Sequence, residues 1–394
     1  MNLFMKYSSR PITYSRKEPM PYDFDLAYKP PAPLRTDFKI GVVGAGFIVR
    51  DIQLVAYRNA GYHVVGIASR SAEVAQAVAD RRGIPRAYES ISSLLEDPLI
   101  EVLDIAVPPD QQLKIVKEAV THADHIKGIL CQKPLAVTLG DAQEIVRLCE
   151  DAGVKLAVNQ NMRYDQSIRA LKTLLVRGEL GEPVLATIEM RAVPHWQDWL
   201  TGYNRLSLLN VSIHHLDCFR FLFGDPESIF VSARRDPRIR SGHADGICLY
   251  NLEYTNGLLA AAWDDVWAGP DFVVKDCYIR WRVEGTKGVA QGTVGWPSYP
   301  NVQPSTINFT TRRQPGYVLS PRWKEVWFPD AFEGTMGQLL DSLARGAEPE
   351  ISGRDNLGTM ALIEAAYLSL EERRLVTVRE ALQRQGGNPK STCK

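Results

Sequence analysis

Two kinds of ionisable side chain in the sequence could exchange a proton with a bound hydroxyl. Lys133 closely follows the apolar run from Gly128 to Cys131 and directly precedes Pro134. His214 and His215 lie together in helix-compatible sequence shortly before Asp217. A histidine titrates near neutral pH, and burial can lower the pKa of a lysine into the same range. These side chains are therefore candidates for general acid–base chemistry.

A glycine turn near the start of the chain could hold a phosphate. The run Ile40-Gly-Val-Val-Gly-Ala-Gly46 is typical of a strand, a tight turn and the start of a helix. Gly44 would permit the turn, and Gly46 would let the backbone approach a pyrophosphate lying on the first N–H groups of the helix. Val49 replaces the third glycine of this fingerprint. The pattern predicts a dinucleotide because it stands at the first junction of a βαβ series.

The end of the second predicted strand bears on the choice of dinucleotide. The acidic residue that would bind the adenosine ribose of NAD is missing, and Ser69-Arg70 stands there instead. A hydroxyl and a guanidinium suit a 2′-phosphate, which favours NADP over NAD. The alternative is that Arg70 stacks on the adenine or points to solvent.

Four short motifs, in order, resemble those of the glucose–fructose oxidoreductase, inositol dehydrogenase and rhizopine-catabolism (Gfo/Idh/MocA) family. They are Gln132-Lys133-Pro134, Asn161-Met162-Arg163-Tyr164, His214-His215-Leu216-Asp217 and Gly353-Arg354-Asp355. Gly224-Asp225-Pro226 also fits. The resemblance covers about residues 38–376. It implies a Rossmann domain followed by an α+β domain, an NAD(P) cofactor and a sugar or polyol substrate.

The resemblance also implies roles for individual residues. Lys133 and His214 would be the acid–base pair, since loss of hydride from a carbinol requires removal of the hydroxyl proton. Only one of two adjacent helical histidines is expected to face the cleft, because they point about 100° apart. The register selects His214. We expect catalytic side chains at Lys133, His214, Asn210 and Asp217; cofactor contacts at Gly44, Ala45, Gly46, Phe47, Ile48, Ser69, Arg70, Pro108, Gln112, Gln132, Lys133 and Asn161; and substrate contacts at Lys133, Arg163, Tyr164, His195, Trp196 and His214.

Two positions depart from the family pattern. Asn210 stands four residues before His214, where the family usually has Asp, and Gln132 replaces the usual Glu. An Asp would fix the tautomer of the imidazole and raise its basicity, whereas Asn210 can only orient it. The departure weakens the histidine as a base or shifts proton transfer toward Lys133. We expect no metal site, because adjacent histidines do not easily face one ion.

Aromatic and polar residues gather in two places in the second half of the chain. Around Trp196 and Trp199, together with His195, Asp198 and Arg205, they would suit a sugar, which binds through aromatic faces and hydroxyl partners. Trp263, Asp264, Asp265 and Trp267 form a second group. The alternative for both is packing in the core or between subunits. Open sheets in this family commonly pair face to face, which implies a homodimer or homotetramer.

Short apolar strands that alternate with helices must position these residues. Strands are predicted at 39–43, 64–68, 102–107, 128–131 and 155–159, with Ser71 as a helix cap. This alternation indicates a parallel sheet covered by helices. The later sequence predicts a strand at 184–192, a helix at 213–223, hairpins at 247–264 and 281–291, and helices at 333–345 and 357–373. Asn256-Gly257 suggests a type I′ turn in the first hairpin.

The chain of 394 residues is long enough for two domains. We expect an extended or disordered arm at 1–36, a Rossmann domain at 37–160, a substrate and oligomerisation domain at 161–376, and a tail at 377–394. For the arm, an unfolded tail is favoured over one anchored on a partner by Tyr14, Tyr22 and Tyr28. The fold class is therefore α/β: a parallel Rossmann sheet plus an α+β domain with a large, mostly antiparallel open sheet.

Composition narrows the partners and the compartment. Lys plus Arg and Asp plus Glu number 46 each, so zero net charge gives no general reason to expect nucleic acid or an anionic membrane. No run approaches about 18 uncharged apolar residues, which argues against a membrane span. Residues 1–35 have no signal-peptide pattern, and the six cysteines include no close pair. We expect a cytoplasmic protein with reduced thiols.

Together these observations predict an oxidoreductase that transfers a hydride between NAD(P) and a sugar, glycoside or cyclic polyol. Two alternatives stay open at this point. One is a glycoside hydrolase or lyase that keeps its cofactor and oxidises the sugar only transiently. The other is an NAD(P)-binding regulator without enzymatic activity.

Overall fold

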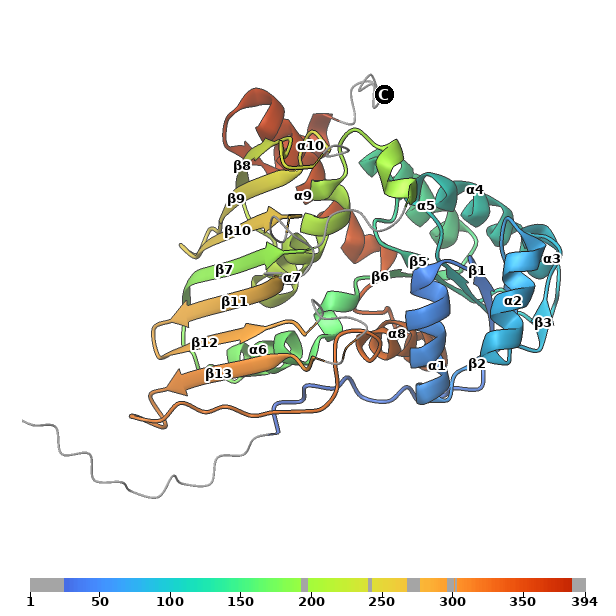
Figure 1. Ribbon diagram of the computed structural model, residues 1–394, viewed down its shortest axis with the longest axis horizontal. Helices are drawn as coiled ribbons and strands as arrows, with labels where there is room; N and C mark the ends of the chain where they lie inside the picture. The colour runs from blue at the N-terminus through green and yellow to red at the C-terminus, as the bar shows by residue number, and fades with distance from the viewer. Residues whose placement is uncertain are drawn as a thin grey trace, which may run out of the picture.

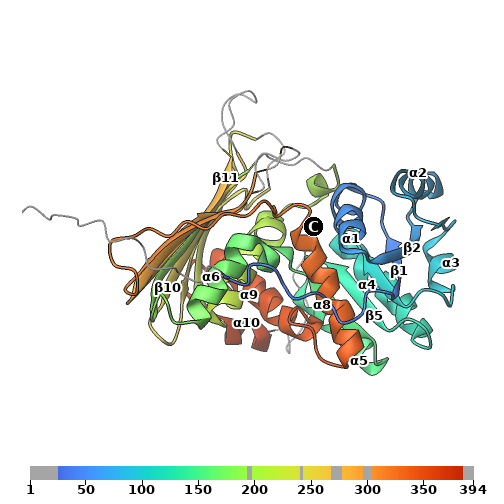
Figure 2. The same ribbon diagram turned by 90° about the horizontal axis from the view of Figure 1, so that it is seen from below.

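The computed structural model describes residues 25–192, 198–239, 243–267, 277–295, 301 and 303–384. The chain folds into two lobes, each built around one sheet (Figure 1). Helices from the later part of the chain fill the space between the lobes (Figure 2). The predicted α/β fold class, with one parallel and one mostly antiparallel sheet, is confirmed.

The first lobe is a six-stranded parallel sheet in the order β3-β2-β1-β4-β5-β6. This is the strand order of a doubly wound dinucleotide-binding fold, whose ligands lie at the carboxyl ends of the strands. Its central strands are apolar on both faces because helices cover both. The strands are β1 (Lys39–Val43), β2 (His63–Ala68), β3 (Arg86–Ala87), β4 (Val102–Ile105), β5 (Gly128–Gln132) and β6 (Lys155–Asn159).

Four helices of the first lobe begin at a side-chain cap or at a proline. The predicted cap is confirmed: Ser71 accepts a hydrogen bond from the backbone N–H of Val74 at 3.2 Å. Pro108 precedes α4, which has proline as its first residue. The helices are η1 (Ile48–Gln53), α1 (Leu54–Ala60), α2 (Ala72–Arg82), α3 (Ile91–Leu95), α4 (Pro109–Ala119), η2 (Val120–His122) and α5 (Leu139–Asp151). Here η1 is a π-helix and η2 a 3₁₀-helix.

The second lobe holds an eight-stranded sheet in the order β13-β12-β11-β7-β10-β9-β8-β14. Its neighbours pair antiparallel except β7 and β10. The strands are β7 (Pro183–Arg191), β8 (Ser228–Arg234), β9 (Ile247–Glu253), β10 (Leu259–Asp265), β11 (Tyr278–Gly285), β12 (Gly288–Thr293), β13 (Thr306–Thr311) and β14 (Val376–Thr377). Both predicted hairpins are present, as β9–β10 and β11–β12.

The type I′ turn predicted between β9 and β10 is wrong. Gly257 has a φ of +85°, but Asn256 does not adopt a positive φ. The N–H of Gly257 donates to the carbonyl of Tyr254 at 3.0 Å, and the N–H of Tyr254 donates to the carbonyl of Leu258 at 3.2 Å. The loop is therefore one residue longer than a two-residue hairpin, with a left-handed glycine at its end.

Helices cover one face of the larger sheet and link it to the first lobe. Figure 2 shows α6, α9 and α10 along that face. Gly128 at the start of β5 lies against Leu339 and Leu343 of α8, so this late helix packs on the first sheet. The helices are η3 (Asn161–Tyr164), α6 (Gln166–Val176), η4 (Asp198–Gly202), η5 (Ser207–Ser212), α7 (Ile213–Phe223), α8 (Ala331–Arg345), α9 (Gly353–Glu372) and α10 (Val378–Arg384).

The termini differ from the expected tails. Residues 25–36 are extended, as expected, but not unfolded: Leu26 is buried, and Tyr28 stacks on Trp323 with ring centroids 5.1 Å apart. The arm thus lies on its own chain, because Leu26 and Tyr28 supply apolar contact with the folded part. Tyr14 and Tyr22 lie outside the described residues. Within the expected C-terminal tail, residues 378–384 form α10 against α9.

Two further expectations concern thiols and membranes. Four of the five cysteines in the described part of the chain are buried, and all five are free thiols. Cys393 lies outside the described residues. Among the described helices, none is long and apolar enough to cross a bilayer.

Candidate active site

The glycine turn lies between the carboxyl ends of β1, β2 and β4. Gly44 has a φ of +119°, and its N–H donates to the carbonyl of Ala68 at 2.8 Å. A Cβ atom at this position would collide with the backbone carbonyl oxygen of Ala106. Glycine is therefore required at position 44 both by the backbone conformation and by the close approach of the residue after β4.

The space beside Gly46 is open at the start of η1. A Cβ atom at Gly46 would meet no described atom within 4 Å, and η1 begins two residues later. The first N–H groups of a helix have no acceptor within the helix and point toward an anion placed there. Ala45, Phe47 and Ile48 complete the predicted turn, and Ile48 also lines the adjacent pocket. Val49, in place of the third glycine, is buried.

The end of β2 carries the two residues that the sequence assigns to the ribose. The Ser69 hydroxyl donates to the carbonyl of Ser71 at 2.6 Å, and Arg70 is exposed. Arg70 can therefore move toward a ligand without losing a buried contact, whereas Ser69 also shapes the turn before α2.

Gln112, an expected cofactor contact, is not among the residues that line the pocket between the lobes. Its side chain is fully buried on α4, and its amide nitrogen donates to the carbonyls of Gln132 at 2.9 Å, Pro134 at 2.8 Å and Leu135 at 3.1 Å. These bonds hold the turn after β5 in place. Gln112 therefore fixes the backbone on both sides of Lys133, while its side-chain oxygen has no hydrogen-bond partner among the described residues.

Lys133 projects into a pocket between the two lobes. The pocket is also lined by Gln132, Asn161 and Asn210. The Lys133 amine donates to the backbone carbonyl of Asn210 at 2.7 Å and approaches its side-chain oxygen at 3.3 Å. Burial lowers the pKa of Lys133 to about 7. The amine can therefore gain or lose a proton at neutral pH.

His214 lines the same pocket from α7. Its ring packs edge-on against Trp327, with centroids 5.5 Å apart, and its Nδ1 has no hydrogen-bond partner among the described residues. Burial, followed by the nearby charges of Lys133 and His215, lowers the pKa of His214 well below its ordinary value. At neutral pH the imidazole is therefore uncharged.

Two expectations, one about Asn210 on η5 and one about His215 on α7, are wrong. Asn210, on the π-helix η5, was expected to orient the imidazole, but its side-chain oxygen lies 3.3 Å from the Lys133 amine. His215 was expected to face away, but it also lines the pocket. The pocket extends along α7 to the larger sheet, where Met190 and Ile279 line it. The rings of His214 and His215 therefore both line it, although they point in different directions.

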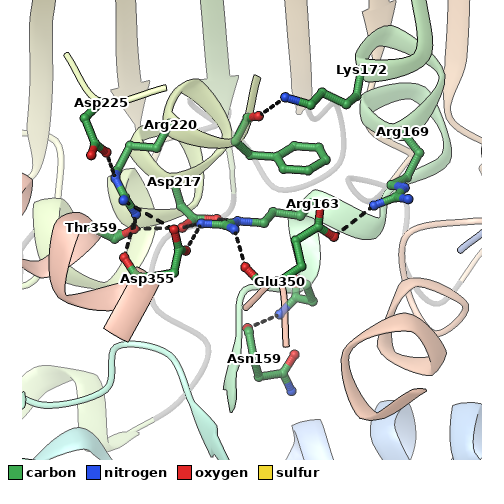
Figure 3. Close-up of polar contacts among 12 residues, drawn as sticks. Asn159, Arg163, Arg169, Lys172, Asp217, Arg220, Asp225, Glu350, Asp355 and Thr359 are labelled. Carbon is green, nitrogen blue, oxygen red and sulfur yellow. Dashed lines mark hydrogen bonds and ion pairs between the residues drawn. The ribbon is translucent and has the colours of Figure 1, made fainter. Parts of the chain in front are cut away.

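Arg163 and Asp217 do not line the pocket, contrary to the predicted substrate and catalytic roles. Figure 3 shows them at the centre of a polar network between η3, α7 and α9. Arg163 donates to both oxygens of Asp217, at 2.6 and 2.7 Å, and to Asp355 at 2.7 Å. The Thr359 hydroxyl also donates to Asp217, at 2.7 Å. Because the Asp217 oxygens are occupied by these donors, the carboxylate joins the elements that carry Asn161 and His214.

Tyr164 is likewise part of the core. Its ring lies against Gly334 of α8, where a Cβ atom would collide with it, and the side chain is buried. Asn161, an expected cofactor contact, lines the pocket and accepts a hydrogen bond from the Trp327 indole N–H at 3.0 Å. His195 and Trp196 lie outside the described residues.

Several pocket residues were missed from the sequence. Trp327 and Phe328 lie in the segment before α8, and Leu200 and Leu206 precede α7. The pair Trp327-Phe328, followed by Pro329, was the only signal for the first group. It could not be linked to Lys133 without knowledge of how α8 returns to the first lobe.

Comparison with known proteins agrees with this arrangement. Residues 38–160 match the family model "Oxidoreductase family, NAD-binding Rossmann fold", and residues 172–378 match "Oxidoreductase family, C-terminal alpha/beta domain". A D-apiose dehydrogenase of Paraburkholderia graminis is 29% identical over 346 residues, which cover 87% of this chain and 90% of the relative. A 1,5-anhydro-D-fructose reductase of Ensifer adhaerens is 29% identical over 255 residues, covering 63% and 73% of the two chains.

Among solved structures, an oxidoreductase from Agrobacterium radiobacter in complex with NAD+, L-tartaric acid and magnesium superposes with a TM-score of 0.73. It is 25% identical, and the match covers 87% of this chain and 99% of that one. The two family models together span both sheets of the structure. The chain therefore belongs to the Gfo/Idh/MocA family of oxidoreductases, with an NAD-binding Rossmann fold and a C-terminal α/β domain.

Proposed function

We propose that this protein transfers a hydride between NAD(P) and a hydroxyl or carbonyl of a sugar or polyol, with Lys133 and His214 as the acid–base groups. One observation carries the proposal: the Lys133 amine lies in the pocket between the lobes, where burial lowers its pKa to about 7. A general acid or base works best with a pKa near the working pH.

The residues around the glycine turn would hold the cofactor. The backbone from Gly44 to Ile48 would bind the pyrophosphate at the start of η1, and Gln132 and Asn161 would lie beside the nicotinamide. The Gln132 side-chain nitrogen is buried without a hydrogen-bond partner among the described residues, so it is available to a ligand. When bound, the cofactor accepts or donates the hydride.

Lys133 would move the proton that accompanies the hydride. In its neutral form the amine accepts the proton of the substrate hydroxyl as the carbonyl forms. In its charged form, two of its three N–H groups reach Asn210 and the third donates to a substrate carbonyl during reduction. His214, uncharged at neutral pH, would bind the same oxygen and hold it in line with the amine.

The substrate class is inferred from the relatives and from the pocket. D-Apiose, 1,5-anhydro-D-fructose, D-xylose and inositol are named as substrates of similar proteins. The pocket combines apolar walls such as Leu206 and Phe328 with polar groups at Lys133, Asn210 and His214. This is the combination that binds the C–H and O–H edges of a carbohydrate.

Two finer proposals concern the cofactor and assembly. We infer that NADP is favoured over NAD, because Ser69 and exposed Arg70 follow β2 in place of the acidic residue that would bind the ribose of NAD. We also infer a homodimer or homotetramer through the larger sheet. Leu185, Leu249 and Leu259 are exposed on three of its strands, and such apolar faces are typical of subunit contacts.

A substrate screen tests the proposed function directly. Purified protein is mixed with pentoses, hexoses, anhydrosugars and inositols in the presence of NAD or NADP, and absorbance at 340 nm is followed. Net formation of reduced cofactor supports a dehydrogenase. Cleavage of a glycoside without net reduction would support the cofactor-retaining hydrolase instead, and cofactor binding without turnover would support a regulator.

A further inference from the structure

The pocket wall contains a second imidazole that the proton transfer described above does not use. His215 lines the pocket next to His214, although only 1% of its surface is exposed. Its Nδ1 lies 2.8 Å from Oδ1 of Asp264 on β10, and Asp264 is equally buried. Asp264 is not among the residues that line the pocket, so the Nδ1 edge of the ring faces away from it.

Asp264 is held firmly on its other side. The hydroxyl of Ser212, at the end of η5, donates to Oδ2 in a short hydrogen bond, and the hydroxyl of Tyr250 on β9 donates to the same oxygen at 3.3 Å. These two donors leave Oδ1 for His215. Oδ1 and Nδ1 are at ion-pair distance but are not aligned for a full hydrogen bond. A carboxylate oxygen this close favours a proton on Nδ1 and leaves a lone pair on Nε2.

Resting on the proposed function, we propose that Nε2 of His215 accepts a hydrogen bond from a second hydroxyl of the substrate, so that the protein selects polyhydroxylated substrates. Among the described residues, the only polar partner of this ring is Asp264, through Nδ1. A substrate hydroxyl would satisfy Nε2, whereas a deoxy substrate would leave it without a partner in a water-poor site. Sites built around a substrate hydroxyl reject analogues that lack it for this reason.

The two histidines have different surroundings, which suits different roles. His214 packs against Trp327 and lies near Lys133, and its Nδ1 has no partner among the described residues. His215 instead lies buried beside the carboxylate of Asp264, which two hydroxyls orient. A hydrogen-bonding group whose direction is fixed discriminates between substrates better than a mobile one.

Two substitutions separate the nitrogen that faces Asp264 from the one that faces the pocket. In His215→Asn, the amide nitrogen can take the place of Nδ1 beside Asp264, but nothing reaches the position of Nε2. In His215→Gln, the longer side chain brings an amide oxygen to the position of Nε2. Thermal melting of both variants checks that they fold.

The measurement is the kcat/KM for oxidation of two matched sets: myo-inositol with its monodeoxy derivatives, and D-glucose with 2-deoxy-D-glucose and 3-deoxy-D-glucose. For wild type, we expect the kcat/KM of one deoxy analogue to be about tenfold or more below that of its accepted parent, as loss of one hydrogen bond predicts. In His215→Asn, the kcat/KM of the parent should fall to that of the analogue, so that the variant no longer distinguishes the two. His215→Gln should retain part of it.

Two other outcomes would overturn the proposal in distinguishable ways. If His215→Asn keeps the wild-type ratio between the parent and every deoxy analogue, His215 does not bind a hydroxyl, although the oxidoreductase function stands. If wild type oxidises no member of either set, nor any sugar or polyol of the wider screen, the proposed function fails and the role of His215 fails with it.

Discussion

The amine of Lys133 lies 2.7 Å from the backbone carbonyl oxygen of Asn210, which is 77 residues later in the chain and belongs to the other lobe. A backbone carbonyl cannot titrate, so this partner orients the amine without fixing its charge. The side-chain oxygen of Asn210, at 3.3 Å, is also neutral. The lysine is therefore held in place with a pKa set mainly by burial.

The pH dependence of turnover follows from this arrangement. Oxidation requires the unprotonated amine, so its kcat/KM should rise with pH through an apparent pKa of about 7 and then level off. Reduction requires the protonated amine and should fall over the same range. His214, with a pKa well below its ordinary value, should add no ionisation between pH 6 and pH 9. Initial rates in both directions check this; a midpoint near that of a free lysine would contradict it.

Asn210→Asp should move this profile. The substitution places a carboxylate about where the neutral oxygen now lies, 3.3 Å from the Lys133 amine. An opposite charge this close favours the protonated amine, so the apparent pKa for oxidation should rise by about 1 to 3 units. The pH profile of kcat/KM measures the shift, with Asn210→Ser as a neutral control. An unchanged midpoint in Asn210→Asp would mean that another group titrates.

The network of Arg163 and Asp217 should matter for stability. Asp217→Asn leaves the buried guanidinium without one of its charged partners, which should lower the free energy of unfolding by about 3 kcal/mol. Asp225→Asn is a matched control, because Asp225 also pairs with an arginine but its side chain is 68% exposed. That control should change stability by less than about 0.5 kcal/mol. Urea unfolding measures the free energy of unfolding of both variants. Equal losses would contradict the prediction that the buried pair contributes more than the exposed one.

A buried carboxylate in the first lobe should make stability depend on pH. Asp104 on β4 accepts hydrogen bonds from Tyr57 at 2.9 Å and from Gln53, and burial raises its pKa to about 7. The folded state then binds a proton that the unfolded state releases near pH 4, so stability should decline as pH rises from about 4 to 7. Asp104→Asn removes the ionisable group and with it this loss of stability at higher pH.

The comparison is urea unfolding of wild type and Asp104→Asn at pH 5 and pH 8. The variant should gain about 1 to 3 kcal/mol relative to wild type between the two pH values. A difference in stability that stays constant with pH would show that Asp104 does not change its charge in this range.

Much of the fold could be predicted from the sequence because its signals are local. Apolar runs marked β1, β5 and β6 to within one residue, Ser71 marked a helix cap, and the glycine turn marked the cofactor edge of the sheet. The lysine and His214 could be placed because each ends or begins an element that the pattern identifies. Their partners could not, because long-range contacts leave no such local signal.

Three contacts illustrate what was not predictable. Asn210 contacts Lys133 from the π-helix η5, and no periodicity in the sequence indicates a π-helix at this position. Gln112 on α4 donates to the backbone of the turn that follows β5 and contains Lys133. Asp217, which motif resemblance placed in the site, is instead the partner of Arg163 in a network outside the pocket.

Turnover by Lys133→Met, with cofactor affinity measured in parallel, tests the central role of Lys133 most directly. Methionine keeps an unbranched, flexible side chain but cannot exchange a proton, and the glycine turn that would bind the pyrophosphate is untouched. We predict that kcat falls by about 10²- to 10⁴-fold on any substrate that wild type accepts, while the Kd for reduced cofactor, followed by its fluorescence, changes less than about threefold. Turnover within tenfold of wild type would contradict the account.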